Sequence, residues 1–563
     1  MKLSVLTAGL FSAGTLAQSC KCFPGDSCWP SVAQWAALNT TVGERLIETV
    51  PLARVCHDPH FNSTQCQALR ARWQYPDMHM DDSASIMAPF FANQSCDPFT
   101  PASKPCALGN YVRYAVAATS TNDVVASIKF ARKHNIRFVI RNTGHDYLAR
   151  STGAGALSIW THKMKSIQFK NFSDPYYQGP AVKVGAGVQG FELLSAGKAR
   201  GKVVVSGECS TVGLAGGYTQ GGGHSALSTS FGLAADNTLE FEVATASGNV
   251  VTASRTKNSD LYWALSGGGG GNYGVVTSLT VKTFPDAKMG GATISFFAHE
   301  NPTETFYAAI DAFHAALPAM VDARSMVVYY FSSAFFMIAP LTAYGQSEAQ
   351  VRAIMAPYVD TLRAMNVTFS VDYSETATYY DHYDKYFGPL PNGNIQIGIA
   401  QYGGRLIPRS VVTNCSSALA LANTARSIAE QGVTWIGVGT DVSRFGGHQH
   451  NAVLPAWRKT LVHVTLTTPW SFNPAEWDRM ITYQKLMTDT IMPAIETVTP
   501  GSGAYMNEAN FQQPNFQREF FGSNYGALQR IKNKYDASGF FYASLGVGSE
   551  RWTVANDGLM CQA

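Results

Sequence analysis

Hydrophobic and polar positions alternate over short distances in the first half of the chain. Residues 121–134 repeat hydrophobic positions at helical spacing and end in basic side chains, which predicts a helix. Residues 136–140 alternate apolar and polar side chains, so we expect a strand that leads into the loop Arg141-Asn142-Thr143-Gly144-His145-Asp146. Further strands are predicted at 156–159, 182–184 and 203–205, and a hairpin at 239–253. Short helices and strands mixed in this way predict an α+β fold.

Longer helices are predicted from about residue 287 to residue 500. The helical patterns cover residues 303–317, 347–365, 416–431 and 474–496. Ser347 and Ser416 are the expected N-caps, and Pro474 is expected at a first helical position. A closing helix is predicted at residues 525–534, in a tail rich in polar and aromatic residues.

An uncharged stretch at residues 325–347 is long enough to cross a membrane. It contains Ser332-Ser333 and Pro340, and it is rich in aromatic and β-branched residues. These features are typical of two buried strands joined by a turn. We therefore expect a hairpin in the core of a sheet.

Composition narrows the class of protein. The 563 residues are 46% hydrophobic and only 14% charged, against about 25% charged in a typical soluble domain. These values argue against a disordered chain or a coiled coil, and the length allows several domains of about 150 residues each. With 42 Lys and Arg against 39 Asp and Glu, the net charge is +3 without a basic run, so nucleic acid is not an expected partner.

The N-terminus has the pattern of a secretory signal. Residues 1–17 begin with Met1-Lys2, continue with an apolar stretch too short to span a membrane, and end at Ala17, where cleavage is expected. Export as a glycoprotein is also favoured by the acceptor sequences at Asn39, Asn62, Asn93, Asn171, Asn366 and Asn414. We expect a secreted, extracellular protein that is not membrane-bound after cleavage.

Seven of the ten cysteines lie in the first 106 residues. In an oxidising compartment this density predicts a disulfide-rich segment at residues 18–106, with Cys56–Cys66 and Cys96–Cys106 as the expected pairs. Zinc is the alternative, but no Cys-x-x-Cys pair is present and the nearby histidines lack finger-like spacing. The remaining cysteines, Cys209, Cys415 and Cys561, are scattered.

Three glycine-rich loops follow one another at residues 185–190, 213–223 and 267–274. Glycine lets the backbone N–H groups approach a phosphate, so these loops predict a dinucleotide cofactor. A P-loop is excluded because no Gly-Lys-Ser/Thr follows, and the loops do not open a βαβ unit as a Rossmann motif does. The alternative is that the glycines serve only turns and bulges.

Two motifs make the prediction more specific: Gly144-His145-Asp146 and Gly207-Glu208-Cys209-Ser210-Thr211-Val212-Gly213. With residues 231–237, 260–265 and Tyr505-Met506-Asn507, they resemble the vanillyl-alcohol oxidase superfamily, in particular the berberine-bridge-enzyme-like oxidases and the fungal branch related to isoamyl alcohol oxidase. The resemblance implies a PCMH-type FAD-binding domain of two α/β subdomains at residues 107–286. It also implies a substrate domain of antiparallel sheet covered by helices at 287–500, and a segment at 501–563 that returns to the FAD domain.

The resemblance further implies that FAD is bound bicovalently, through His145 to the 8α carbon and through Cys209 to C6 of the flavin ring. Imidazole and thiolate are suitable nucleophiles for these bonds. The alternatives are a buried, hydrogen-bonded His145, and a disulfide from Cys209 to Cys415 or Cys561. The other cofactor-binding residues predicted are Arg141, Gly144, Gly207, Thr211, Val212, Gly213, Gly217, Tyr218, Gly222, Gly223, Asn237 and Asn507.

Two of these positions bear on the type of flavoenzyme. Tyr218 stands where many relatives have His, which leaves its role open. Val212 resembles the position that controls access of O₂, where a small residue goes with oxidases, and Gly207 is compatible with an oxygen pocket. Both residues favour an oxidase over a dehydrogenase.

The family reaction is hydride transfer from an alcohol carbon, or a related C–H, to flavin N5, after which O₂ is reduced to H₂O₂. A base must take the substrate proton. The candidates are Glu508, Tyr505 and Tyr402, and the sequence does not choose among them. We expect a small-molecule substrate of secondary metabolism, O₂ as second substrate, no metal, and a monomer.

Other classes remain as alternatives. Gly223-His224-Ser225-Ala226-Leu227 lacks the last glycine of a serine-hydrolase elbow. His448-Gln449-His450 has the residue types of a metal site but no carboxylate partner beside it. On the same scaffold, the alternatives are a carbohydrate oxidase, a flavin dehydrogenase or oxidative cyclase, and a flavoprotein without catalytic activity.

Overall fold

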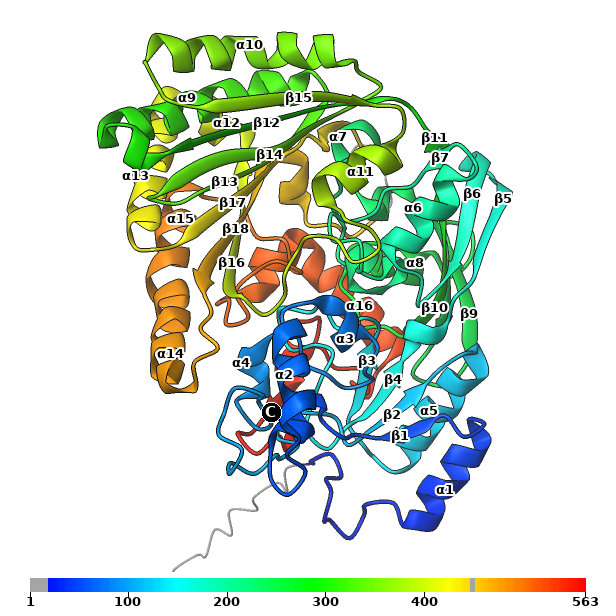
Figure 1. Cartoon of the computed structure of the whole chain (residues 1–563). Helices are drawn as coiled ribbons and strands as arrows, with labels where there is room; N and C mark the ends of the chain where they lie inside the picture. Colours follow the sequence, from blue (N-terminus) through cyan, green and yellow to red (C-terminus); the bar gives the residue numbers. More distant parts are fainter. Residues whose placement is uncertain (1–18, 446–450) are drawn as a thin grey trace, which may run out of the picture.

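The computed structural model describes residues 19–445 and 451–563. The predicted signal peptide at 1–17 and the motif His448-Gln449-His450 lie outside the described residues. Figure 1 shows the arrangement: a large sheet with its covering helices at the top, a second sheet at the right, and the N-terminal segment in blue at the bottom. The fold is α+β, as the sequence predicts, with sheets of both mixed and antiparallel type.

A four-stranded sheet in the order β1-β2-β4-β3 carries the first predicted motif. β2 and β3 pair with β4 in parallel, and β1 is antiparallel to β2. The predicted helix forms as α5 (Thr121–Lys133), with Ser120 accepting a hydrogen bond from Asp123 N at its start. The strands are β1 (Leu46–Glu48), β2 (Tyr114–Ala117), β3 (Phe138–Arg141) and β4 (Leu157–Trp160).

A five-stranded antiparallel sheet lies beside it, in the order β5-β6-β10-β8-β9. The predicted hairpin is confirmed as β8 and β9, while the strand predicted at 203–205 reduces to β7 (Lys202–Val203), paired with β11 (Phe284–Pro285). The short helices α6 (Gly190–Lys198) and α8 (Ser259–Leu265) contribute to the same core. The strands are β5 (Ile167–Asp174), β6 (Tyr177–Gly185), β8 (Thr238–Ala244), β9 (Val250–Ser254) and β10 (Val275–Lys282).

The largest sheet has seven antiparallel strands in the order β15-β12-β14-β13-β17-β18-β16. The uncharged stretch forms β13 and β14, so the predicted core hairpin is confirmed. Among residues 19–445 and 451–563, no helix has the length and apolar character of a membrane span. The strands are β12 (Met289–Phe297), β13 (Ser325–Phe331), β14 (Phe335–Tyr344), β15 (Ser370–Thr376), β16 (Ala400–Pro408), β17 (Thr434–Gly439) and β18 (Thr460–Pro469).

Helices cover one face of this sheet and share its main hydrophobic core (Figure 1). Ser347 caps α10 as predicted, but the prediction of Ser416 as a cap is wrong. Asn414 caps that helix instead, because its side-chain oxygen accepts hydrogen bonds from Ser416 N and Ser417 N. The helices are α9 (Thr303–Asp322), α10 (Glu348–Ala364), α12 (Arg409–Thr413), α13 (Cys415–Glu430), α14 (Trp477–Leu486) and α15 (Met492–Val498).

The helix predicted at 474–496 forms, but it is irregular along its length. A short 3₁₀ turn starts at Pro474, α14 follows, and a π-helical turn at 487–491 separates it from α15. Pro493 has no backbone N–H for a bond to the preceding turn, so the regular pattern breaks at that point.

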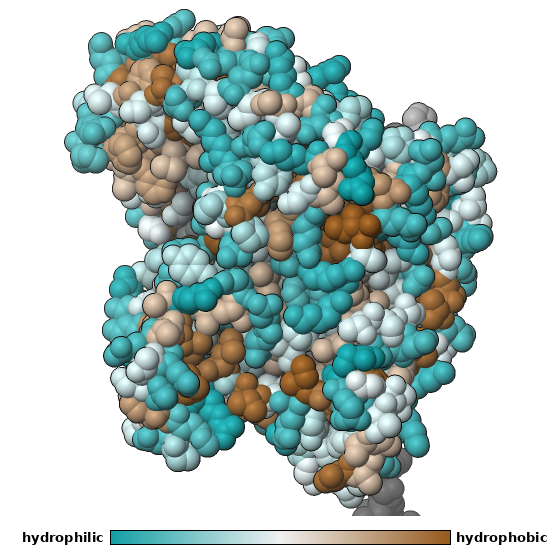
Figure 2. Space-filling model, turned by 45° about the vertical axis from the view of Figure 1, so that its right-hand side comes forward, coloured by the Kyte–Doolittle hydropathy of each residue, from teal (hydrophilic) through white to brown (hydrophobic). Residues whose placement is uncertain are grey.

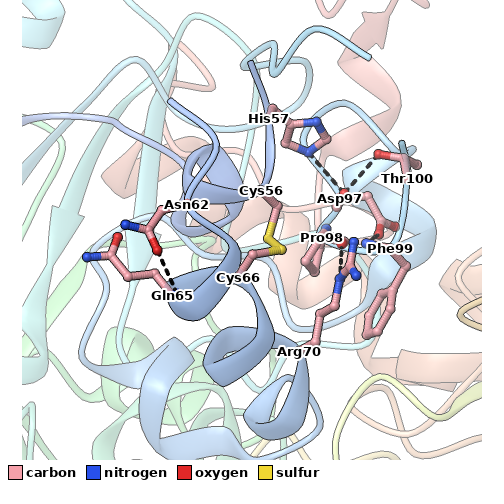
Figure 3. Close-up of a disulfide and its surroundings, with 10 residues drawn as sticks. All are labelled: Cys56, His57, Asn62, Gln65, Cys66, Arg70, Asp97, Pro98, Phe99 and Thr100. Atoms are coloured by element: carbon pink, nitrogen blue, oxygen red, sulfur yellow. Dashed lines mark hydrogen bonds between the residues drawn. A yellow bond between two sulfur atoms is a disulfide. The ribbon is translucent and has the colours of Figure 1, made fainter. Parts of the chain in front are cut away.

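Disulfides organise the N-terminal segment. The predicted pairs Cys56–Cys66 and Cys96–Cys106 are confirmed, and Cys22 bonds to Cys28. In Figure 3, His57 and Arg70 reach from the first of these disulfides to the backbone carbonyls of Asp97 and Pro98, at 3.0 and 2.6 Å. The helices of this segment are α1 (Val32–Thr41), α2 (Ser63–Arg72), α3 (Pro76–Met80) and α4 (Pro89–Ala92).

The disulfide Cys20–Cys561 joins the first and last parts of the described residues, a pair that the sequence did not predict. Within the described residues, Cys209 and Cys415 are free, so a disulfide from Cys209 to either Cys415 or Cys561 is wrong. The predicted closing helix is α16 (Tyr525–Tyr535), and β19 (Trp552–Val554) pairs with β20 (Met560–Gln562). Side chains of residues 504–528 enter the core of the five-stranded sheet, which brings the C-terminal segment back to the first half of the chain.

Hydrophilic residues cover most of the face in Figure 2, and hydrophobic residues form small separate patches. Of the six acceptor asparagines, Asn39 is half-buried, and its side-chain amide bonds to Glu44. The others are exposed: Asn62, Asn93, Asn171, Asn366 and Asn414.

Candidate active site

The loop after β3 presents His145. Gly144, at φ 91°, brings the loop so close to Arg141 that a Cβ atom there would lie 2.6 Å from the guanidinium. Arg141 is buried and donates a hydrogen bond to the carbonyl oxygen of His79, at 2.9 Å. Burial lowers the pKa of Arg141 to about 10. The structure therefore uses Arg141 to fix the His145 loop against the N-terminal segment.

The loop that carries Cys209 contacts the segment that follows β15, an edge strand of the large sheet. Tyr383 of α11 (Tyr379–Phe387) directs its hydroxyl to the carbonyl oxygens of Gly207 and Glu208, at 3.0 and 2.7 Å. Ser210 donates its hydroxyl to Pro391 O at 2.8 Å. The position of Cys209 thus depends on contacts between the two halves of the chain.

Thr211 brings His145 and Cys209 together. Its Oγ1 lies 2.8 Å from His145 Nε2 and 3.4 Å from Cys209 Sγ. Burial, with a smaller effect of the Arg141 charge, lowers the pKa of His145 to about 4, so its imidazole is neutral. Burial raises the pKa of Cys209, although Thr211 opposes this through its hydrogen bonds. Two nucleophiles of the types predicted to bind flavin therefore lie side by side, both half-buried.

The three glycine-rich loops converge beside them. Gly190 N donates to Val212 O at 3.1 Å, and the backbone N–H groups of Gly267 and Gly269 donate to Gln220 O at 3.0 and 2.8 Å. A Cβ atom at Gly221 would lie 2.5 Å from Asn507 Nδ2. The loops pack so closely here that side chains in place of the glycines would fill the space between them. Glycine keeps this space open, as a backbone cradle for a dinucleotide requires.

The cradle also contains buried polar atoms that make no hydrogen bond to the described residues. They include Asn142 Oδ1, beside Gly213, and Gln220 Oε1, within the second loop. Unpaired buried polar atoms are costly in a folded protein unless a ligand satisfies them. Their presence beside the glycine loops and the two nucleophiles fits FAD.

Asn507 and Tyr505 connect the C-terminal segment to this cradle. Asn507 Nδ2 donates to Gly217 O at 2.8 Å and to the Tyr505 hydroxyl at 2.9 Å. Tyr218 donates its hydroxyl to His224 O at 2.9 Å. Asn237 instead donates to the carbonyl oxygens of Phe231 and Leu233, so its amide holds its own loop, beside α7 (Ser228–Phe231).

The face of the large sheet opposite its helices carries polar and aromatic side chains on β16 and β18. Along β18, Val462, Val464 and Leu466 enter the helix-covered core, so the alternate residues His463, Thr465 and Thr467 point to the other face. On β16, Tyr402 is the partner of Thr467, and it stacks on Tyr147 with ring centroids 3.8 Å apart. Burial raises the pKa of Tyr402 to about 12.

Glu508 lies between two histidines. His224 Nε2 is 2.9 Å from one carboxylate oxygen of Glu508, and His463 Nε2 is 2.8 Å from the other. Thr465 donates its hydroxyl to Glu508 at 3.3 Å, and Glu208 Oε1 lies 3.5 Å from His224 Nδ1. The approach of Glu508 requires Gly404 on β16, because a Cβ atom there would collide with the Glu508 carbonyl oxygen.

The charges in this group follow from its burial and its pairs. Burial alone would raise the pKa of Glu508, but the charge and hydrogen bonds of His224 and His463 lower it well below its usual value. Burial lowers the pKa of His224 less than Glu508 and Glu208 raise it, to about 10. For His463 burial dominates, and its pKa is lowered.

The structure thus places the three predicted proton acceptors in one region and adds residues that sequence reasoning missed. Tyr505 packs its ring against His224 and His463, at 5.5 and 5.4 Å between centroids. A histidine at a polar position of an alternating strand was the available signal for His463. His224 was visible only as part of the incomplete hydrolase motif.

Comparisons with known proteins agree with this geometry. A family model described as FAD binding domain matches residues 112–254, and one described as berberine and berberine like matches residues 504–548. The chain is 57% identical over 544 residues to "FAD-linked oxidoreductase ZEB1" of Gibberella zeae, covering 97% of this chain and 95% of the relative.

Solved structures give the same result. The VAO-type flavoprotein MtVAO615 from Myceliophthora thermophila C1 is 41% identical and superposes with a TM-score of 0.93, over 97% of this chain and 100% of that one. Glucooligosaccharide oxidase from Acremonium strictum, described with a 6-S-cysteinyl, 8α-N1-histidyl FAD, is 19% identical with a TM-score of 0.63 and covers 78% of this chain and 92% of its own. That likeness concerns the fold alone.

The chain belongs to the VAO-type FAD-linked oxidoreductases. The predicted family, the α+β fold with its FAD-binding domain, and the activity class of an FAD-dependent oxidoreductase are confirmed. The serine-hydrolase interpretation is wrong: Ser225 Oγ accepts a hydrogen bond from Leu227 N, and the ring nitrogens of His224 face Glu508 and Glu208.

Proposed function

We propose that this protein is a secreted oxidase that carries FAD bound through both His145 and Cys209 and oxidises an alcohol, or a related C–H group, of a small metabolite. The observation that carries the proposal is the contact of both side chains with Thr211. Each is a suitable nucleophile, and their common place explains two bonds to one ring system. Bound flavin would accept the hydride at N5 and pass the electrons to O₂, giving H₂O₂.

The protein's own groups would orient the substrate and take its proton. Glu508 is the proposed proton acceptor, because its carboxylate is part exposed, at 29% of the side chain, while His224 and His463 hold it in one orientation. Tyr402 and Tyr147 would form the aromatic wall of the substrate site. Tyr505 would position Asn507 through their hydrogen bond. Val212 and Gly207 are the proposed residues on the path of O₂.

The attachment is tested by the absorbance spectrum and intact mass of acid-denatured protein. We expect the flavin absorbance to stay with the polypeptide in the wild type and in either single variant, His145→Ala or Cys209→Ala, and to be released in the double variant. Cys415→Ala is the matched control, because Cys415 is the other free cysteine in the described residues and is exposed. A colourless wild-type protein of unmodified mass would contradict the proposal.

The proton acceptor is tested by the rate of flavin reduction under anaerobic conditions. Glu508→Gln keeps the size of the side chain but removes its basic oxygen. We expect it to slow reduction about 10²- to 10⁴-fold while the flavin stays bound. Reduction at the wild-type rate would remove Glu508 from this role. A product that is an aldonolactone would instead identify a carbohydrate oxidase.

Secretion is supported by the four disulfides found in residues 19–445 and 451–563, and by five exposed glycosylation acceptors. The mature chain would begin at Gln18 and act as a monomer. N-terminal sequencing of protein from the culture medium, and its mass before and after removal of N-glycans, test this part. Intracellular protein that retains Met1 and carries no glycans would contradict it.

A further inference from the structure

The side chains of His224, His463 and Glu508 offer two imidazole nitrogens and a carboxylate oxygen that all lie within 4.8 Å of one another. The three residues come from separate parts of the chain: a glycine-rich loop, strand β18 and the C-terminal segment. We propose that they form a binding site for a divalent transition-metal ion. A metal was not expected from the sequence, and membership of the family does not require one.

The donor set indicates the kind of ion. Two imidazoles and one carboxylate are ligands that Zn²⁺, Fe²⁺, Co²⁺ and Mn²⁺ accept, whereas Ca²⁺ and Mg²⁺ prefer oxygen ligands alone. A set of three protein ligands leaves at least one coordination position open. The part-exposed Glu508 side chain gives the ion a path from solvent.

The distances are compatible with this assignment. Glu508 Oε1 lies 2.9 Å from His224 Nε2, and Oε2 lies 2.8 Å from His463 Nε2. Around a tetrahedral ion with bonds of about 2.0 Å, neighbouring ligand atoms are separated by roughly 3.3 Å. Movements of a few tenths of an ångström would therefore open the group for an ion.

A second observation comes from the other side of the His224 ring. Glu208 Oε1 is buried and lies 3.5 Å from His224 Nδ1, and neither atom makes another hydrogen bond to the described residues. Histidines that bind metals usually direct their second ring nitrogen at a carboxylate, which fixes the ring and strengthens the ligand. Glu208 stands in this position, next to Cys209.

The bound ion would also have a catalytic role, which rests on the proposed oxidase function. An ion bound at His224, His463 and Glu508 would lie on the side of the site where Tyr505 packs against both histidines. At its open position it would hold and polarise the oxygen of an alcohol substrate. Glu508 would bind the ion through one carboxylate oxygen, and its other oxygen would accept the proton that the alcohol loses.

The competing interpretation is a cluster joined by protons alone, with each histidine donating to Glu508. Flavin-loaded protein, freed of metals with a chelator and dialysed against Zn²⁺, distinguishes the two by its zinc content, measured by inductively coupled plasma mass spectrometry. We expect one Zn²⁺ per chain in the wild type, and loss of this ion in Glu508→Gln and His463→Asn. We expect Glu208→Gln to weaken affinity about 10- to 100-fold.

His299→Asn is the matched control, because His299 is exposed and lies outside the site. It should retain the ion, and the flavin absorbance of each variant reports that it is folded. No zinc in the wild type, or equal zinc in the wild type and Glu508→Gln, would overturn the proposal. Zinc uptake is measured without substrate, so a protein that binds the ion but shows no oxidation would refute the oxidase function alone.

Discussion

Tyr383→Phe tests whether the large sheet's side of the molecule positions Cys209. The Tyr383 hydroxyl is buried between the carbonyl oxygens of Gly207 and Glu208, at 3.0 and 2.7 Å. Removing it leaves these acceptors without their donor, which costs about 1–3 kcal/mol. Since 1.4 kcal/mol is a factor of ten in an equilibrium constant, opening of the Cys209 loop should become about 5- to 150-fold more favourable.

Hydrogen exchange of residues 204–212, followed by mass spectrometry, measures this opening directly. Tyr379→Phe is the matched control: Tyr379 is buried on the same helix, and its hydroxyl lies beside Ser225 and donates to neither of these carbonyl oxygens. We expect faster exchange in Tyr383→Phe and wild-type exchange in Tyr379→Phe.

A chemical readout is available in the background of His145→Ala, where Cys209 would be the remaining flavin link. There, Tyr383→Phe should lower the fraction of flavin that stays with acid-denatured protein, and Tyr379→Phe should not. Equal exchange and equal linkage in the two phenylalanine variants would refute the view that Tyr383 holds this loop.

Three further predictions concern the large sheet and its neighbours. Glu519→Gln should destabilise the protein by about 3 kcal/mol, because Arg405 loses its buried charge partner at 2.6 Å; a thermal-inactivation half-life like that of the wild type would contradict this. The pKa of buried His382 is lowered to about 3 by burial, against about 6.5 in the unfolded chain. The unfolded state binds more protons between these values, so stability should fall by up to about 1.4 kcal/mol per pH unit as pH decreases through this window. His382→Asn should make that dependence shallower in denaturation curves, and an unchanged slope would exclude His382 as its source. Gly404→Ala should displace Glu508, since its Cβ would meet the Glu508 carbonyl oxygen, and should slow flavin reduction; an unchanged rate would show that the loop adapts.

Several residues of the candidate site could be predicted from local sequence. His145 follows a strand with alternating residues, Cys209 lies in a distinctive motif, and Cys56 and Cys66 are only 10 residues apart. Such features depend on neighbouring residues in the chain, and the covalent chemistry of histidine and cysteine is the same in any fold. The predicted N-cap at Ser416 failed because Asn414, two residues earlier, offers the backbone N–H groups a better acceptor.

The sequence by itself therefore determined the strand and helix pattern, the glycine loops and the two nucleophiles. Tertiary structure alone decided which residues surround Glu508: His224 is 284 residues away in the chain and His463 is 45 residues away. The register of β18 against β16 and the close approach at Gly404 bring them together. Contacts of this kind depend on how separate elements pack, and a pattern of neighbouring residues does not determine that packing.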